Sequence, residues 1–123
     1  TGGALSGNIS VTGTIYASGD ITAFSDARLK KNVVPLTGAL DAVMKLRSVQ
    51  YVMKSDKLEQ VKCGFIAQEV REVIPEVVVE LDDEDKTLSV DYSKITAYLV
   101  EAMQEQQRLI EELRLEIEKL KSK

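Results

Sequence analysis

The chain has 123 residues, 44% of them hydrophobic, and a net charge of −4, which suits one compact domain with an extended segment at either end. It has no histidine, so zinc hydrolase and Ser-His-Asp mechanisms lack a ligand or base that they require. We expect no cofactor and no metal ion. The acidic balance disfavours nucleic acid and anionic membranes as partners, because an acidic surface repels phosphate.

Cysteine usage and the apolar runs bear on the cellular setting. Cys63 is the single cysteine, so we predict no internal disulfide, a reducing compartment and a buried side chain at this position. No apolar run approaches the roughly 18 residues of a spanning helix, and the start lacks the pattern of a signal peptide. The chain begins at Thr1 without methionine, and we expect it to be a fragment of a longer protein.

Residues 1–27 contain no lysine or arginine and are rich in Gly, Ser, Thr and Ala. A six-residue pattern begins at Gly7, Gly13 and Gly19, with Ile in its third place and Val or Ala in its fifth. Alternating apolar and polar residues between glycines predict short strands stacked in rows. Because each row has only two inward side chains, the strip needs partner chains to complete a core. The alternative is a flexible linker.

The middle of the chain, about 28–92, has the pattern of a small α+β domain. Pro35 suits the first turn of a short helix whose apolar face is Leu36, Ala39, Leu40, Val43, Met44 and Leu46. Alternation predicts a strand at 49–53, and a short helix follows from Ala67 to Val73, closed by Pro75. Residues 77–81 and 87–90 predict a hairpin, whose acidic tip we interpret as a solvated turn rather than a calcium loop.

Several single residues of this domain have predicted packing roles. Gly64 is expected to permit a close backbone approach. Phe65, Ile66 and Val70 are expected in the core. We expect Tyr92, where the last helix begins, to be a packing residue rather than an acid or base.

Residues 93–123 contain no Gly or Pro and predict one long helix, capped by Asp91 or Ser93. Along this helix the residues of one face recur at alternating spacings of three and four residues, which predicts a parallel coiled coil. We call this face the seam. The seam residues are Leu99, Met103, Gln106, Ile110, Leu113, Ile117 and Leu120. Ile and Leu at these places favour two strands, whereas a stripe widened by Ala102 and Leu109 favours more. A single helix packed on its own domain is the alternative.

Three sequence blocks carry a resemblance to a known family. Residues 25–33 (SDARLKKNV) resemble the start of the intramolecular chaperone auto-processing family, peptidase family S74. Residues 64–78 and 90–105 are similar to its second and third blocks, in the family's order. The resemblance implies a homotrimeric domain that closes phage tail spikes and tail fibres, aligns the three chains for folding, and then cuts itself away.

This resemblance also implies an organisation, partners and a location. We expect the end of a β-repeat fibre stalk at 1–25, the α+β chaperone domain at 26–92 and a coiled-coil helix at 93–123. The partners are two further copies and the upstream β-structured fibre of the same chain, without nucleic acid or membrane. The expected locations are the host cytoplasm during assembly and the virion tail fibre for the upstream part.

By position, the resemblance makes Ser25 the nucleophile and Lys30 its base. We expect the cut beside Ser25, with the bond between Ser25 and Asp26 favoured, and which side of Ser25 is cut stays open. A lysine amine can accept a serine proton once burial or nearby positive charge favours its neutral form. The expected supporting residues are Arg28, Lys31, Asn32, Gln68 and Glu69. Whether the attack comes from the same chain stays open.

Three alternative interpretations are also consistent with the sequence. Ser25 can simply cap a turn while Lys30 is a surface charge. The domain can be a permanent, non-cleaving trimerisation cap of a fibre. It can also be a glycan-binding fibre tip, although six aromatic residues and no tryptophan offer little for a sugar site.

Overall fold

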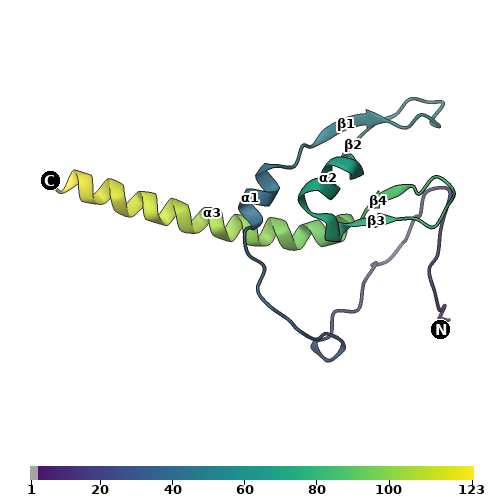
Figure 1. Cartoon of the computed structure of the whole chain (residues 1–123), viewed down its shortest axis with the longest axis horizontal. Coiled ribbons are helices and arrows are strands. Elements are labelled where there is room, and N and C mark those ends of the chain that lie inside the picture. Colours follow the sequence, from purple (N-terminus) through teal and green to yellow (C-terminus); the bar gives the residue numbers. More distant parts are fainter. Residues whose placement is uncertain (1–2) are drawn as a thin grey trace. The chain divides into compact units, whose positions relative to one another are not determined.

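The computed structural model describes residues 3–123 and has a mixed α+β fold (Figure 1). It divides into two compact units, one ending at Val34 and the other spanning Pro35–Lys123. The elements are η1 (Ala27–Leu29), α1 (Ala39–Met44), β1 (Val49–Val52), β2 (Val61–Gly64), α2 (Ala67–Val73), η2 (Pro75–Val77), β3 (Val78–Glu80), β4 (Leu88–Val90) and α3 (Tyr92–Lys121). No helix among residues 3–123 combines the length and the apolarity needed to cross a membrane.

The first unit has no strand between residue 3 and its short turn η1. The strand rows predicted there are therefore absent from the single chain. Ile9, Ile15 and Ile21, the third residues of the three repeats, are 67%, 67% and 81% exposed. A row with two inward side chains has no apolar surface of its own to pack against, so nothing in one chain holds it as a strand. Pairing between copies stays a prediction.

The core of the second unit lies where α2 and η2 pack against the first turns of α3. Val70, Ile74, Val77 and Ile95 form this cluster, each no more than 4% exposed. The hairpin β3–β4 runs antiparallel with Val78 opposite Val90, which confirms the predicted hairpin. Asp83 closes its tip by accepting a hydrogen bond from the backbone N–H of Thr87 at 2.8 Å. Hydrogen bonding by the Thr87 side chain, and then by this N–H, lowers the pKa of the Asp83 carboxyl.

The structure confirms α2 at Ala67–Val73 and corrects the beginning of α1. This helix begins at Ala39 rather than near Pro35, because Gly38 at its N-cap adopts a left-handed φ of 68° that a helix cannot contain. The Glu105 side chain of α3 replaces the missing side-chain cap. Its Oε2 accepts hydrogen bonds from the backbone N–H groups of Ala39 at 2.9 Å and Leu40 at 3.1 Å.

Strand β1 matches the predicted strand, and its partner β2 was missed by sequence analysis. The two pair antiparallel, with Val49 opposite Gly64 and Gln50 opposite Cys63. The burial predicted for Cys63 was wrong, since it is exposed, because this two-stranded ribbon has no layer covering that face. Ile66 was also expected in the core but is 39% exposed, because it is the N-cap residue of α2.

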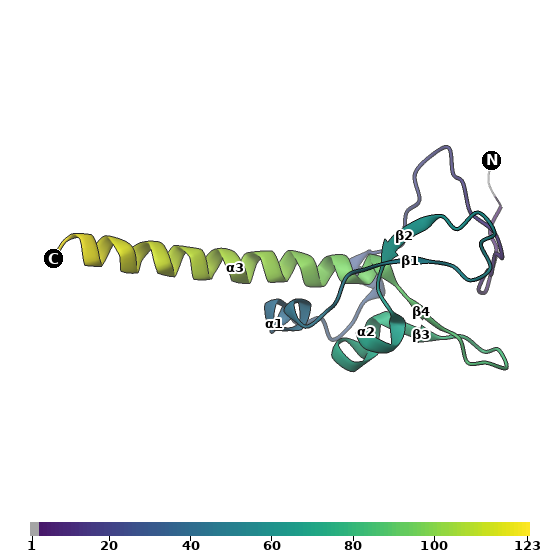
Figure 2. The ribbon, with the colours of Figure 1, turned by 90° about the horizontal axis from the view of Figure 1, so that it is seen from above.

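Helix α3 confirms the predicted long helix, and α1 packs along its first half (Figure 2). Asp91 is its N-cap residue, but its carboxylate accepts from the Ser93 hydroxyl at 2.6 Å instead of from a backbone N–H. Ala102 faces α1 and is buried. The seam residues are exposed in the single chain, Met103 at 72% and Leu113 at 62%. They therefore form an apolar stripe without a partner in one chain.

The end of β2 is held against the beginning of α3. The Tyr92 hydroxyl accepts a hydrogen bond from the backbone N–H of Phe65 at 3.2 Å, and the two rings stack 5.9 Å apart. A Cβ atom at Gly64 would lie 2.5 Å from the Tyr92 hydroxyl oxygen. Gly64 thus permits a close approach, as predicted, although the approaching group is the Tyr92 side chain rather than backbone. Tyr92 has the packing role predicted for it.

We expect Gly64→Ala to destabilise the second unit by about 1–3 kcal/mol, because the new methyl group overpacks this junction. In a Tyr92→Phe background the same substitution should cost less, since the clashing oxygen is gone. Urea unfolding of the four proteins measures both costs. Equal costs in the two backgrounds would show that the Tyr92 hydroxyl does not restrict this position.

Candidate active site

The candidate site is built on η1, a single turn in the first unit. Asp26 is its N-cap residue, and its Oδ1 accepts a hydrogen bond from the backbone N–H of Arg28 at 2.9 Å. The backbone N–H of Leu29 donates to the Asp26 carbonyl at 3.0 Å, and that of Lys30 donates to the Ala27 carbonyl at 3.1 Å. An aspartate at this position satisfies amide groups that a short helix leaves unpaired. The turn reverses the chain, so that residue 30 returns toward residue 25.

This reversal brings together the two residues predicted as the catalytic pair. The Lys30 Nζ donates a hydrogen bond to the Ser25 Oγ at 2.6 Å. Both residues belong to one chain and to one compact unit, and both are exposed. The distance lies within the hydrogen-bond reach that a base needs to take a hydroxyl proton.

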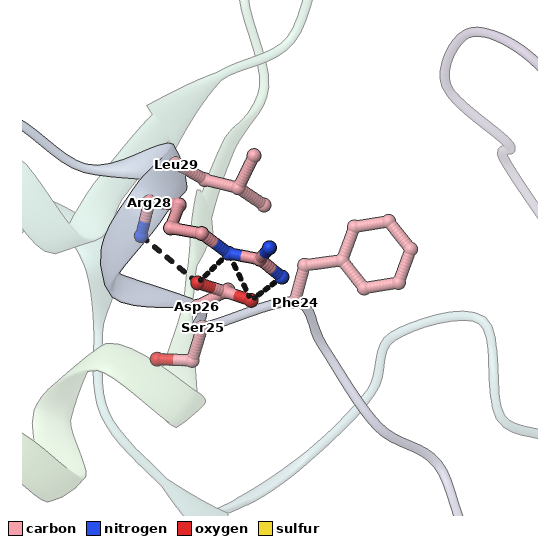
Figure 3. A pocket seen from close by; sticks show the side chains of 5 residues that line it. All are labelled: Phe24, Ser25, Asp26, Arg28 and Leu29. Atoms are coloured by element: carbon pink, nitrogen blue, oxygen red, sulfur yellow. Dashed lines mark hydrogen bonds and ion pairs between the residues drawn. The ribbon is translucent and has the colours of Figure 1, made fainter.

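Asp26 and Arg28 form an ion pair beside this contact (Figure 3). The Arg28 Nη2 lies 2.7 Å from the Asp26 Oδ2, and its Nε lies 3.1 Å from Oδ1. The side-chain bonds from Arg28, followed by its backbone N–H, lower the pKa of the Asp26 carboxyl, and the same pairing raises the pKa of Arg28. Arg28 therefore carries its charge next to a carboxylate, which offsets part of its field.

An open depression of about 480 Å³ adjoins the turn, lined by Phe24, Ser25, Asp26, Arg28 and Leu29. Phe24 and Leu29 expose 95% and 69% of their surface. In Figure 3 the Ser25 hydroxyl and the Phe24 ring point to different sides of the backbone. The hydroxyl is accordingly not enclosed by its own chain.

The other predicted supporting residues are distributed over both units. Lys31 and Asn32 follow the turn directly, and Asn32 has a left-handed φ of 56°. Gln68 and Glu69 lie in α2 of the second unit. There Arg47 binds Glu69 through two bonds of 2.6 and 3.0 Å and lowers the pKa of its carboxyl. Within residues 3–123 no group of three or more acidic or cysteine side chains is arranged to hold a metal ion.

Asp26 is predicted from the sequence only as a cleavage position, and its part in forming the turn is seen only in the structure. A signal was available, because aspartate readily bonds the backbone N–H two residues later and so nucleates turns. Arg47, the partner of Glu69, was also missed. It lies 22 positions earlier in the chain and outside any recognised block, so no local pattern indicates it.

Comparison with known proteins agrees with the resemblance seen in the sequence. Residues 25–79 match the Peptidase_S74 family, described as chaperone of endosialidase. The long tail fiber protein Gp37 of Enterobacteria phage K3 is 38% identical over 98 residues, which cover 72% of this chain and 8% of that protein. Its counterpart in Enterobacteria phage M1 is 36% identical over 118 residues, covering 83% of this chain and 45% of the relative.

A relative from an animal also matches. Myelin regulatory factor homolog 1 of Caenorhabditis elegans is 31% identical over 118 residues, covering 88% of this chain and 12% of that protein. The chain thus spans less than half the length of each of these relatives. The segment that matches the family, residues 25–79, contains both Ser25 and Lys30.

We predict that Arg28→Gln raises the pKa of Asp26 toward its ordinary value of 3.8, because the guanidinium bonds are lost. In the unaltered chain the pKa of Asp26 is lowered, so the ion pair stabilises the turn fully at pH values above the ordinary pKa. This stabilisation is lost as the pH falls through the lowered pKa, because the carboxylate becomes protonated. A carboxyl-carbon NMR titration of Asp26 in both proteins measures this. An unchanged midpoint would show that the ion pair does not persist in solution.

Proposed function

We propose that this chain assembles a tail fibre or tail spike and then releases itself. The starting point is the match of residues 25–79 to the Peptidase_S74 family, described as chaperone of endosialidase. Three copies align the fibre chains that precede them, and each copy is cut once beside Ser25, between Ser25 and Asp26. The observation that carries the proposal is the hydrogen bond of 2.6 Å between Lys30 and Ser25, because it joins a nucleophile to a base without histidine.

The chemistry needs the Lys30 amine in its neutral form when the Ser25 hydroxyl attacks. The amine then accepts the hydroxyl proton while Oγ bonds to the carbonyl carbon, and it returns that proton to the departing amide nitrogen. In the single chain both side chains are exposed, and water stabilises a charged amine. Burial between assembled copies favours the neutral form instead. We therefore infer that cleavage depends on assembly.

The apolar stripe of α3 supports assembly through this helix. Ile110, Leu113 and Ile117 are between 43% and 62% exposed, and they recur at the spacing of a coiled-coil seam. In a single helix this stripe stays in contact with water, which is unfavourable. Association of copies in register buries the stripe and so lowers the free energy. The stripe is widened by Leu109, also exposed at 49%, which suits three helices better than two.

The relatives support the setting of this proposal. Two of them carry the name long tail fiber protein and come from bacteriophages. We accordingly place this chain at the end of a phage fibre, assembled in the host cytoplasm, with the upstream part entering the virion tail. A permanent trimerisation cap that never cleaves would share the same fold and the same apolar stripe. The two functions are therefore distinguished by whether the chain is found cut or intact.

We expect the unaltered chain to yield a fragment beginning at Asp26, and Ser25→Ala and Lys30→Ala to slow its appearance by at least about 100-fold, as loss of a nucleophile or base does. Intact-mass analysis of freshly expressed protein detects the fragment. Ser55→Ala and Lys57→Ala, at exposed positions of the second unit, serve as matched controls and should cleave normally. An uncut wild-type chain in a stable trimer would favour the permanent cap.

Replacing a seam residue should weaken assembly and cleavage together. Ile117→Ser removes an apolar side chain whose burial contributes about 1.5–3 kcal/mol, so association should weaken by about tenfold or more. Glu118→Ser changes the adjacent residue outside the seam and should leave both properties unchanged. Sedimentation equilibrium and the rate of fragment formation measure the two effects. A monomeric variant that cleaves at the wild-type rate would contradict the coupling.

A further inference from the structure

The position of the cut places a geometric limit on which hydroxyl can make it. The Ser25 Oγ is connected to its own carbonyl carbon through only Cβ and Cα, and that carbon belongs to the Ser25–Asp26 bond. Attack within the residue would close a β-lactone ring, whose internal angles are far below relaxed values and store large strain. Such a small ring would also prevent the hydroxyl oxygen from approaching the carbonyl carbon in the orientation that the reaction requires. The Ser25 hydroxyl is therefore badly placed to cut the bond that follows it.

The structure nevertheless completes the nucleophile and base within each chain. Lys30 reaches Ser25 of the same chain at 2.6 Å, because the turn formed by Asp26 and Arg28 brings it back. Ser25 and Asp26 are both exposed, so the attacking oxygen and the bond to be cut are each accessible from outside their own chain. What one chain lacks is a suitable position of the Ser25 carbonyl carbon relative to its own Ser25 hydroxyl.

We propose that the Ser25–Lys30 pair of each chain cuts the Ser25–Asp26 bond of a neighbouring copy. This inference rests on the proposed function, since it assumes both self-cleavage at that bond and association. In a closed ring of three identical chains, each chain can act on the next in the same direction. The chain is thus both protease and substrate, and a monomer cannot cut its Ser25–Asp26 bond, because its own hydroxyl cannot attack that carbonyl carbon without closing a strained ring.

The step balances without any co-reactant except water. The Ser25 Oγ bonds to the carbonyl carbon of the partner's Ser25, and the hydroxyl proton passes to the Lys30 amine. The bond from that carbon to the nitrogen of the partner's Asp26 breaks, and the nitrogen takes the proton as it leaves. An ester then joins the two chains. Water, deprotonated by the Lys30 amine, hydrolyses this ester, restores the Ser25 hydroxyl and leaves a carboxylate on the partner's Ser25.

A route within one chain exists, but it cuts a different bond. Attack of the Ser25 hydroxyl on the carbonyl of Phe24 closes an unstrained ring and transfers the preceding chain from nitrogen to oxygen. Hydrolysis of that ester leaves a fragment that begins at Ser25 rather than Asp26. The first residue of the released fragment therefore reports which route operates.

Co-expression of wild-type and Ser25→Ala chains in equal amounts tests the proposal, with C-terminal tags of different mass to identify each chain. Cutting between neighbours predicts that about half of the Ser25→Ala chains are cut before Asp26 and about half of the wild-type chains stay uncut, because each chain depends on one neighbour in the ring. Cutting within a chain predicts that every wild-type chain and no Ser25→Ala chain is cut. That second result, or fragments beginning at Ser25, would overturn the proposal.

Two further mixtures separate this proposal from the proposed function. Wild-type protein alone has to be cut for self-cleavage to hold, and its failure would remove the proposed function itself. A mixture of Ser25→Ala and Lys30→Ala chains should stay uncut, because no chain then contains a complete pair. Cleavage restored in that mixture would show that the hydroxyl and the amine come from different chains, which contradicts the contact within one chain. Exchanging the tags between the chains controls for their own effects.

Discussion

The hydrogen bond between Lys30 and Ser25 exists because one turn of backbone is held closed by one aspartate. Asp26 accepts from the backbone N–H and the guanidinium of Arg28, and the resulting reversal gives the lysine its position. The contact is local in sequence, so it can form before any other part of the domain folds. In the function proposed above, its reactivity is not local, because burial between assembled copies favours a neutral amine. That proposal separates the geometry, which one chain supplies, from the reactivity, which assembly supplies.

The apolar side chains likewise fall into two groups, one buried within the single chain and one exposed on it. The core of the second unit is small and closes on Val70, Ile74, Val77 and Ile95. The isoleucines of the N-terminal repeat and the seam of α3 stay exposed. Apolar surface of this extent is unusual for a protein that functions as a monomer. Folding of one chain therefore buries apolar side chains only in the middle of the sequence and leaves the isoleucines of the repeat and the seam of α3 exposed.

Elements set by local pattern could be predicted from the sequence. Helix α2 ends where Pro75 forbids its continuation, and α3 continues because nothing in residues 93–121 breaks it. Strand β2 could not be predicted, because its four residues become a strand only by pairing with β1. The beginning of α1 depends on the carboxylate of Glu105, 66 positions away from Ala39. The Ser25–Lys30 pair was indicated by resemblance and the turn at Asp26 had a local signal, whereas the ion pair between Asp26 and Arg28 is seen only in the structure.

The Glu105 carboxylate fixes where α1 begins, because it binds the first residues of this helix. It therefore also fixes the length of the segment that links the Ser25–Lys30 turn to α1. Only eight residues separate Lys30 from Ala39, and the chain between these two residues spans at most about 30 Å when fully extended. If three α3 helices join as proposed, each Ser25–Lys30 turn is therefore tethered within a small shared volume. Tethers this short correspond to effective concentrations of about the millimolar range, so encounters between turns no longer depend on how dilute the protein is.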